Sequence, residues 1–471
     1  MRARLKAKAQ RWKFTALRAT KKLRLYRERL RRCHNRIARL EAQVRELEKI
    51  TQPRRIPNHT YPVQMVAMAI FMVTQAQVSL RGAAKSIGYF SKLMGWSFAA
   101  PGHVTVLRWV LRAGLYQLKS SAEDRSGQFA GILDESISLG GEKLLLFQGV
   151  NLSNRDLDKK QPLVGQDVEV LAMQVSPSWQ AEGVERYLEE AMAKSPEMKL
   201  DYVVTDGGHN LRKALANKGI DQVGDCTHLL MNLVKKQYRD NSLLSELCAQ
   251  IGTLRRQTIL GRYGFLAPPT LRDKDRFLRI FNILDWVVKI DGARSWIEEE
   301  ASQRLKFIDT YRPLLQELRQ VRTFISFTSK IFKSEGMCES SVQQWQDYLK
   351  NWRREQSQVF EPVTKMVSAV EQYLTNHQDL MNKYGKLICC SDIIESTFGR
   401  YKNKGGVKAI SADVLKIPLY HVDITLDFVD RALTCVTYQE VYEWETVNTC
   451  PTRYTQLRAL RDRTESATAA A

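Results

Sequence analysis

Cysteines are few in this sequence, and long apolar runs are absent. The 471 residues include eight cysteines, none of them in a CxxC pair, and Cys389 and Cys390 are adjacent. This spacing fits neither a disulfide framework nor a zinc knuckle, so we expect reduced thiols. The longest uncharged apolar run, residues 65–73, has nine residues, whereas a bilayer crossing needs roughly 18. The first 30 residues also lack the apolar core of a signal peptide. We therefore expect a soluble, cytoplasmic protein, nucleoid-associated if its source is bacterial.

Acidic residues are scarce in the first part of the chain. Residues 1–55 contain 20 Lys or Arg and only four Glu, a net charge of +16, and the whole chain has a net charge of +21. Such an excess favours a polyanionic partner, and double-stranded DNA is the usual one. The whole chain is 44% hydrophobic and 26% charged, which is ordinary for a globular protein. We expect a basic arm joined to a folded body.

Apolar residues between positions 23 and 47 recur in alternating steps of three and four. They are Leu23, Tyr26, Leu30, Cys33, Ile37, Leu40, Val44 and Leu47. This heptad pattern predicts a coiled-coil seam, and its later a and d positions favour a parallel pair of chains. We therefore expect a homodimer formed through residues 23–47. The alternative is a single amphipathic helix that packs on the body of its own chain. Pro53 and Pro57 would end the helix in either case.

Residues 58–122 have the pattern of a helix-turn-helix region. We expect a first helix over about 61–77 and a second helix that begins with Ser79 as its N-cap. A break at residues 99–102 precedes a third helix, which begins at His103. In such a motif the last helix enters the major groove and other positions contact phosphates. The expected base contacts are His103, Thr105 and Arg108, and the expected phosphate contacts are Arg81 and Lys85. The alternative is a three-helix packing unit with a solvated basic face.

From residue 127 the apolar pattern changes to that of strands. Strands are expected over 129–141, 142–152, 164–176 and 201–206 and near Val223, with helices over 179–193, 209–216 and 228–238. The order βββαβαβα predicts an α/β layer. Residues 240–385 contain no convincing strand and predict an all-helical region. Its expected core tryptophans are Trp286, Trp296, Trp345 and Trp352. Further helices are expected over 386–445, followed by a tail over 446–471.

Two aspartates stand in or at the end of expected strands. Asp134 lies in GILDES, and Asp206 ends YVVTD, where Gly207 and Gly208 let the backbone turn. A carboxylate in an apolar strand is unfavourable unless it is paired or bound to a cation, so each is expected to hold one. Hard ions such as Mg²⁺ are satisfied by a few carboxylates, water and substrate phosphate. The alternative for each residue is an aspartate that caps a turn.

Together these features resemble the insertion-sequence DDE transposases, which have an RNase H-like core. The resemblance covers roughly residues 60–430 and places the two Asp at Asp134 and Asp206 and the final Glu at Glu395, within SDIIESTFGRYKNK. The sequence after Asp206 also resembles the hAT and Mutator types, in which an Asp or Cys is followed three residues later by a His. Here these two residues are Asp225 and His228.

The resemblance implies an α/β fold and a phosphoryl-transfer enzyme. The fold is an RNase H-like mixed sheet flanked by helices over 127–239 and 386–445, interrupted by the helical insertion 240–385. The activity is strand cleavage and strand transfer at terminal inverted repeats of DNA. Mg²⁺ or Mn²⁺ would be the cofactor, held by Asp134, Asp206 and Glu395.

Further residues are expected to contact the substrate or to support the metal ligands. The expected phosphate contacts after the final Glu are Arg400, Lys402 and Lys404. The expected supporting residues are His209, Asp225 and His228, and His228 could instead simply cap or pack its helix.

Two other functions are compatible with the same sequence features. One is a domesticated transposase that binds DNA and has lost its chemistry. The other is an RNase H-like metal-dependent nuclease, which releases DNA ends without joining them. Glu361 and Glu371 also lie on late helices and are alternatives to Glu395.

Overall fold

The computed structural model describes residues 2–51, 53–137, 141–153, 160–270, 276–402, 410–451, 456–458 and 460–461. The chain divides into two compact units. Unit 1 comprises Met1–Val73, Val78–Leu107 and Ile424–Thr434, and unit 2 comprises Thr74–Gln77, Arg108–Asp423 and Cys435–Ala471. None of the helices in the described ranges has the length and apolar character needed to cross a membrane.

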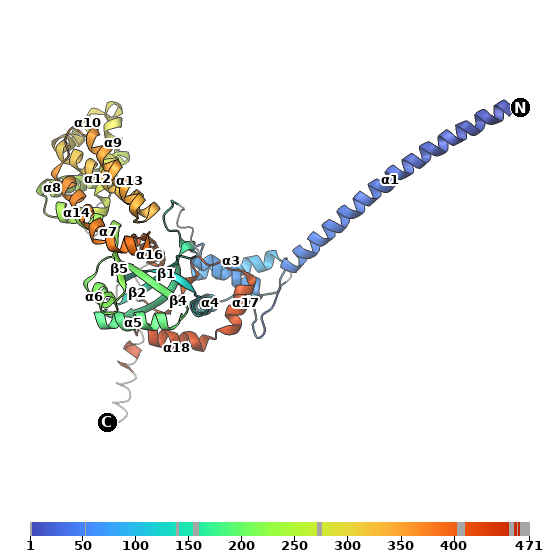
Figure 1. The fold of residues 1–471 in the computed structure, drawn as a ribbon, viewed down its shortest axis with the longest axis horizontal. Coiled ribbons are helices and arrows are strands. Elements are labelled where there is room, and N and C mark those ends of the chain that lie inside the picture. Colours follow the sequence, from blue (N-terminus) through green and yellow to red (C-terminus); the bar gives the residue numbers. More distant parts are fainter. Residues whose placement is uncertain are drawn as a thin grey trace, which may run out of the picture. The chain divides into compact units, whose positions relative to one another are not determined.

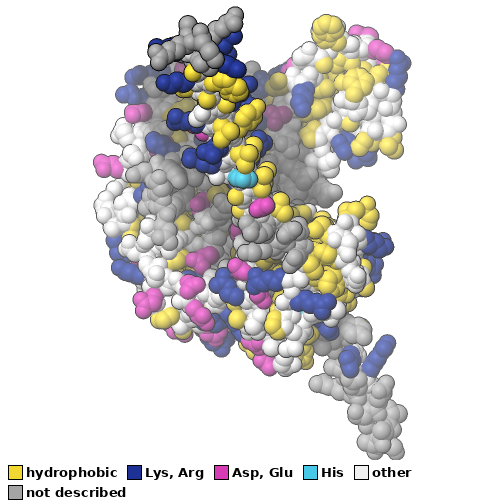
Figure 2. All heavy atoms as spheres, turned by 90° about the vertical axis from the view of Figure 1, so that its right-hand side faces the viewer, with side chains coloured by type: hydrophobic (Ala, Val, Ile, Leu, Met, Phe, Trp, Pro, Cys, Tyr) yellow, Lys and Arg dark blue, Asp and Glu magenta, His cyan; other side chains and the backbone are white. Residues whose placement is uncertain are grey.

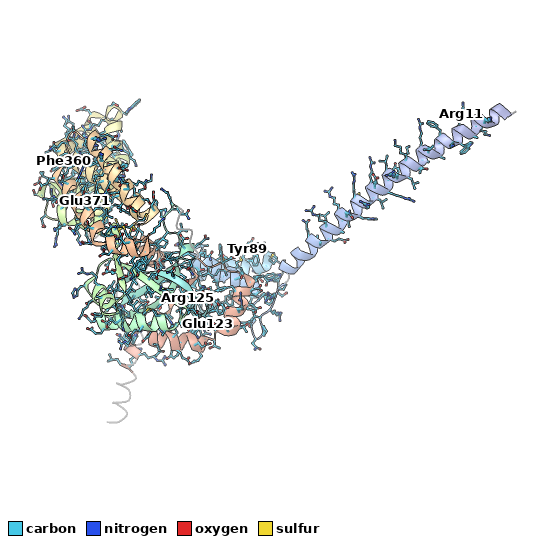
Figure 3. All side chains as sticks on the ribbon, in the orientation of Figure 1. Arg11, Tyr89, Glu123, Arg125, Phe360 and Glu371 are labelled. Carbon is cyan, nitrogen blue, oxygen red and sulfur yellow. The ribbon has the colours of Figure 1, made fainter. Side chains whose placement is uncertain are left out.

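The N-terminal helix α1 is one long helix, Arg2–Thr51, of 50 residues. Its heptad side chains between residues 23 and 44 are all exposed, and that of Leu47 lies outside the described residues. Figure 3 shows the side chains of α1, Arg11 among them, projecting around the helix, and Figure 2 shows hydrophobic side chains along it with Lys and Arg beside them. Within unit 1, the described seam side chains are therefore not packed against other elements. Pairing of two chains stays a prediction.

Unit 1 contains the helices that the helix-turn-helix pattern predicted. They are α2 (Val63–Thr74), α3 (Leu80–Leu93) and the first turns of α4 (His103–Glu123), and α2 is shorter than expected. Ser79 caps α3 as predicted, because its side chain accepts a hydrogen bond from the Gly82 amide at 3.1 Å. A fourth helix, α17 (Leu426–Cys435), joins unit 1 from far along the chain, where Arg54 pairs with Asp427 at 2.9 Å.

Unit 2 contains a mixed sheet of five strands (Figure 1). They are β1 (Gly127–Ile137), β2 (Lys143–Asn151), β3 (Glu169–Ser176), β4 (Met198–Thr205) and β5 (Asp221–Gly224). The strand order is β3-β2-β1-β4-β5, with β1, β2 and β3 antiparallel and with β4 and β5 parallel to β1. The third strand begins later than the expected residue 164. There Asp167 accepts a hydrogen bond from the Val164 amide at 2.8 Å and closes a 3-10 turn before the strand.

Helices cover both faces of this sheet. On one face, Phe129, Leu133 and Phe147 form a core with α5 (Ala181–Ala193) and α6 (His209–Asn217). On the other face, α16 (Asp392–Lys402) packs against β1. Alternate residues of a strand point to opposite faces, so Ile132 and Asp134 share the face that α16 covers.

The described residues between 242 and 384 are mainly helical, as the sequence predicted. The helices are α8 (Ser242–Thr258), α9 (Arg276–Ala293), α10 (Glu299–Leu305), α11 (Phe307–Thr310), α12 (Arg312–Glu335), α13 (Glu339–Glu355), α14 (Glu361–Asn376) and α15 (Gln378–Tyr384). Trp345 is fully buried, and Trp286 and Trp352 are nearly so, as expected of core residues. The expectation was wrong for Trp296, which is 87% exposed. It stands in a short 3-10 turn, Arg294–Trp296, instead of on the buried face of a long helix.

Candidate active site

The two predicted aspartates lie side by side at one edge of the sheet. Strands β1 and β4 are parallel neighbours, and Ile132 is paired with Val204. Asp134 is two residues after Ile132, and Asp206 is two residues after Val204, so both aspartates lie on the same face. Neighbouring strands are about 4.8 Å apart, so the register brings together two carboxylates that are far apart in the sequence.

A tight turn orients Asp206. Its Oδ1 accepts a hydrogen bond from the Gly208 amide at 2.8 Å, and Gly207 has a φ of +85°, a conformation that favours glycine. The turn therefore uses one carboxylate oxygen. Among the described residues, the other oxygen forms no hydrogen bond and remains free for a ligand.

Asp134 is half-buried among like charges. Burial raises its pKa to about 7, helped by the negative charges of Asp206, Glu395 and Asp225, while a hydrogen bond from the Glu135 amide at 2.7 Å acts in the opposite direction. No basic side chain in the described part of the chain pairs with Asp134. Asp134 therefore carries its negative charge without an ion-pair partner among the described residues.

Glu395 reaches this cluster from the first turn of α16. Helix α16 is tied to the sheet by Gln148 of β2, whose Nε2 donates to the Thr397 hydroxyl at 3.2 Å. Partial burial raises the pKa of Glu395, as do Asp392 and Asp225, whereas His228 and Lys333 lower it. The fold thus places a residue from the end of the chain near the two strand aspartates, as the resemblance implied.

Asp225 connects the parts that carry these carboxylates. It caps α7 (Cys226–Tyr238), because its Oδ1 accepts from the His228 amide at 2.8 Å. Its Oδ2 accepts from the Ser391 amide at 2.8 Å and also from the Ser391 hydroxyl. Its own amide donates to the carbonyl of Thr205, the residue before Asp206, at 2.9 Å. Asp225 is buried and serves as a structural anchor for both Asp206 and α16.

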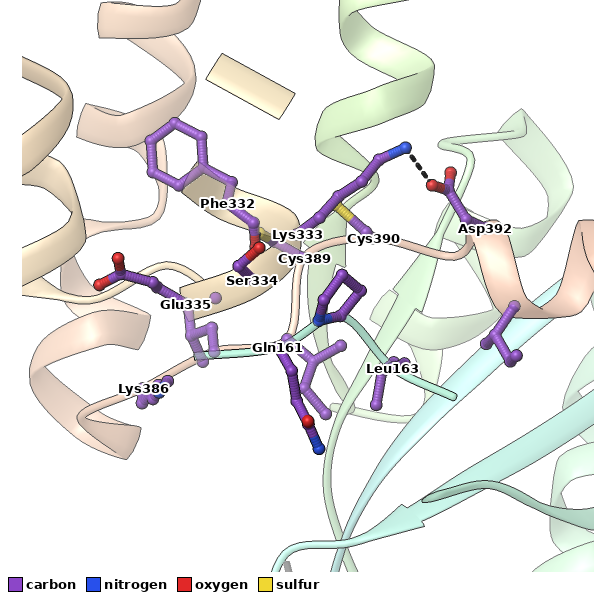
Figure 4. A pocket seen from close by; sticks show the side chains of 15 residues that line it. Gln161, Leu163, Phe332, Lys333, Ser334, Glu335, Lys386, Cys389, Cys390 and Asp392 are labelled. Atoms are coloured by element: carbon purple, nitrogen blue, oxygen red, sulfur yellow. Dashed lines mark hydrogen bonds and ion pairs between the residues drawn. The ribbon is translucent and has the colours of Figure 1, made fainter. Parts of the chain in front are cut away.

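A basic side chain stands at the start of α16. Lys333 of α12 forms an ion pair with Asp392 beside the buried thiols of Cys389 and Cys390 (Figure 4). These residues line a cavity of about 60 Å³. Lys333 and Ser391 were not predicted as site residues. Only the fold brings Lys333 to the start of α16, and Ser391 lies in the segment of Glu395 but bonds to Asp225, 166 residues away in the sequence.

The predicted supporting histidines and the predicted DNA-contacting residues lie in different parts of the chain. His228 is near Glu395, since its charge lowers the pKa of that residue. His209 is the exposed first residue of α6, and no described interaction joins it to the carboxylates. In unit 1, Arg81, Lys85 and His103 are exposed and Thr105 is half-buried. Arg108 is exposed in unit 2 and lies over the Tyr438 ring, 4.7 Å from its centroid.

Arg400 has a structural environment. Its guanidinium donates to the carbonyls of Thr74 at 2.7 Å and Gln75 at 3.2 Å, and lies 4.5 Å from the centroid of the Tyr420 ring. These partners occupy much of the donor capacity of the guanidinium, which leaves few N–H groups for a phosphate. The phosphate contact of Arg400 stays a prediction. Lys402 is exposed, and Lys404 lies outside the described residues.

The donor set of the cluster is chemically suited to a hard divalent cation. All three predicted ligands are carboxylates, and Mg²⁺ is commonly held by one or two carboxylates, with water and substrate phosphates completing its shell. Within the described ranges, however, no three Asp, Glu, His or Cys side chains converge closely enough to form a ready metal cage. The register of β1 and β4 makes Asp134 and Asp206 neighbours, and Glu395 is near enough for its charge to raise the pKa of Asp134. A scan of protein-family models and a search of curated proteins found no match to this chain.

Proposed function

We propose that the protein is a metal-dependent DNA transposase of the DDE type with an RNase H-like core. The observation that carries this proposal is the register of β1 and β4, which makes Asp134 and Asp206 neighbours, with Glu395 of α16 near enough for its charge to raise the pKa of Asp134. The strand order β3-β2-β1-β4-β5, with the first Asp on the central strand, supports the same proposal. The helical region between α7 and α16 then corresponds to the insertion of this architecture.

The proposed chemistry divides the work among the acidic residues. Asp134 and Asp206 would hold Mg²⁺ or Mn²⁺, and Glu395 would complete the ligand set. A bound divalent ion would activate a water or 3′-hydroxyl and stabilise the leaving oxygen during in-line displacement at phosphorus. Asp225 would keep α16 and the end of β4 in register. His228, next to Glu395, can donate a hydrogen bond to a phosphate oxygen.

The remaining parts of the chain fit the handling of DNA. The excess positive charge of residues 1–55 would supply phosphate contacts that depend strongly on salt. Helices α3 and α4 would read the terminal repeats through the predicted contacts, and α1 would pair two chains. Cleavage at the two ends of an element by a paired enzyme is consistent with such a dimer.

The test is cleavage of a duplex that contains the flanks of the coding region, with Mg²⁺ or Mn²⁺ present. Asp134→Asn, Asp206→Asn and Glu395→Gln should each lower the cleavage rate by roughly three orders of magnitude while leaving binding nearly unchanged. Glu371→Gln tests the alternative to Glu395 and should leave the cleavage rate unchanged, because Glu371 is an exposed residue of α14 in the helical region (Figure 3). Full cleavage by one of the three variants would remove that residue from the catalytic set.

The same assay separates the other two functions. Binding without cleavage by the unaltered chain would favour a domesticated DNA-binding protein. Cleavage with no joining of 3′ ends to a second duplex would favour a nuclease. Either result would contradict the proposed transposase.

A further inference from the structure

Helix α7 has a polar face that leads away from the candidate active site. We define the α7 stripe as His228, Asn232, Lys235 and Arg239, where Arg239 is the C-cap of the helix. Their spacing of four, three and four residues places them within about 60° around a helix of 3.6 residues per turn. The His228 amide donates to Asp225 at 2.8 Å, and Asp225 is bonded both to Ser391, just before α16, and to Thr205, just before Asp206, so one end of the stripe begins at the candidate site.

The opposite face of α7 is fixed in the core. Leu230, Val234 and Tyr238 are buried, and the Tyr238 hydroxyl donates to Glu317 of α12 at 2.6 Å. The helix therefore begins at the Asp225 cap beside the sheet and ends among the helices of residues 242–384 (Figure 1). Because its buried face is held in place, the α7 stripe has a fixed position relative to the carboxylates.

The stripe is positively charged and uncompensated. Lys235 and Arg239 are exposed, and among the described residues neither forms an ion pair or a side-chain hydrogen bond. Helix α7 itself contains no Asp or Glu. By contrast, Arg312 and Arg322 of the neighbouring α12 are paired with Asp291 and Asp285. The cations of the α7 stripe are thus available to an external anion.

We propose that the α7 stripe binds the sugar-phosphate backbone of one DNA strand as that strand leaves the catalytic centre. This inference rests on the proposed function, since it takes DNA as the substrate of the acidic cluster. Arg239 is eleven positions after His228, which is about 16 Å along a helix. That length corresponds to about five nucleotides of one strand of B-DNA. An exposed Lys and Arg make phosphate contacts without reading sequence, so the stripe sets the path of the strand and not the choice of site.

Chemical footprinting of lysines tests this proposal directly. The full chain carrying Asp134→Asn, which blocks cleavage, is acylated with and without a saturating mixed-sequence duplex in Mg²⁺, and modification is measured by mass spectrometry. Lys235 should react several-fold more slowly when DNA is bound. Lys194 is the control, since it is an exposed C-cap residue of α5, on the other face of the sheet, and its reactivity should not change.

A double charge-reversal variant, compared with a single control variant, gives an independent measurement. Lys235→Glu with Arg239→Glu should raise the KM for cleavage about tenfold and leave kcat nearly unchanged, whereas Lys194→Glu should alter neither. Equal reactivity of Lys235 in free and DNA-bound protein would overturn the proposal even if the chain cleaves DNA. If DNA protects Lys235 but the unaltered chain shows no cleavage, the result would support DNA binding by the α7 stripe and contradict the proposed catalysis. Protection of Lys235 by an acidic peptide, with none by the duplex, would also overturn it.

Discussion

Asp225 accepts two hydrogen bonds from Ser391 on one carboxylate oxygen, one from the Ser391 amide at 2.8 Å and one from the Ser391 hydroxyl. Ser391 immediately precedes α16, and Glu395 lies one turn into that helix. The other oxygen of Asp225 caps α7, and its amide is bonded to the end of β4. One buried carboxylate therefore determines how a late helix is seated against an early strand.

The first prediction concerns this anchor. Asp225→Asn replaces an acceptor-only carboxylate with an amide, so at least one N–H of its partners faces another N–H. We expect a loss of about 1–3 kcal/mol of folding free energy and a large drop in metal-dependent cleavage with binding retained. Ser391→Ala should be milder in stability and should raise the Mg²⁺ concentration needed for half-maximal cleavage. Ser368→Ala, at an exposed position of α14, is the control. An unchanged Mg²⁺ requirement in Ser391→Ala would contradict the positioning role.

The second prediction concerns pH and metal. The folded pKa of Asp134 is about 7, above the unfolded value, so the native state binds more protons between about pH 4 and 7. The metal-free protein should therefore lose stability as pH rises through this window, by about 2–4 kcal/mol from this group. Asp134→Asn should remove that loss, which thermal unfolding at pH 5 and pH 8 would reveal. Mg²⁺ should raise Tm more at pH 8 than at pH 5, because protons compete with the ion. Equal Mg²⁺ effects at both pH values, or in Asp134→Asn, would count against this carboxylate as a ligand.

The third prediction tests packing in unit 2. A Cβ on Gly114 of α4 would come within 1.8 Å of the Leu415 carbonyl oxygen, which belongs to backbone. Gly114→Ala should destabilise the protein by about 1–3 kcal/mol or more, because backbone must move to admit the methyl group. Gly292→Ala is the matched control in α9, where no atom lies within 4 Å, and it should be neutral or stabilising by up to about 1 kcal/mol. Thermal unfolding of the two variants measures the difference, and equal Tm values would contradict the close approach.

The fourth prediction concerns the exposed seam of α1. Ile37→Asp places a charge at an a position and should convert a dimer to a monomer in sedimentation experiments, whereas Ala38→Asp, outside the seam, should not. Cys33 occupies a d position and is exposed in the single chain. In a parallel pair, mild oxidation should link two chains through Cys33, and Cys33→Ser should prevent it. A dimer that survives Ile37→Asp would show that the chains pair elsewhere.

Sequence patterns predicted the elements that depend on local chemistry. The N-cap at Ser79 and the helix from His103 are where turn residues and periodicity predicted them, and β1 and β4 overlap the expected strands 129–141 and 201–206, with Asp206 directly after β4. Contacts between distant residues had no such signal. Arg54 pairs with Asp427 across 373 positions, and Arg400 binds the carbonyls of Thr74 and Gln75.

The candidate site shows the same division. The two aspartates were predictable because each interrupts an apolar run, Asp134 within β1 and Asp206 directly after β4, and Glu395 came from a resemblance to known enzymes. Lys333 and Ser391 act through tertiary neighbours, and nothing in their own segments distinguishes them from other polar residues. The delayed start of β3 has a local cause in the Asp167 turn, which a strand pattern does not reveal.

The chain leaves the sheet layer at the start of α7 and returns to it beside the same place. The Cys226 amide, at the start of α7, donates to the carbonyl of Cys389 at 2.8 Å. The helices between these two positions thus form a closed excursion whose two ends are already joined. Its size can vary without stretching the connection between β5 and α16, so the same small sheet could carry helical domains of very different length and still keep its acidic residues aligned.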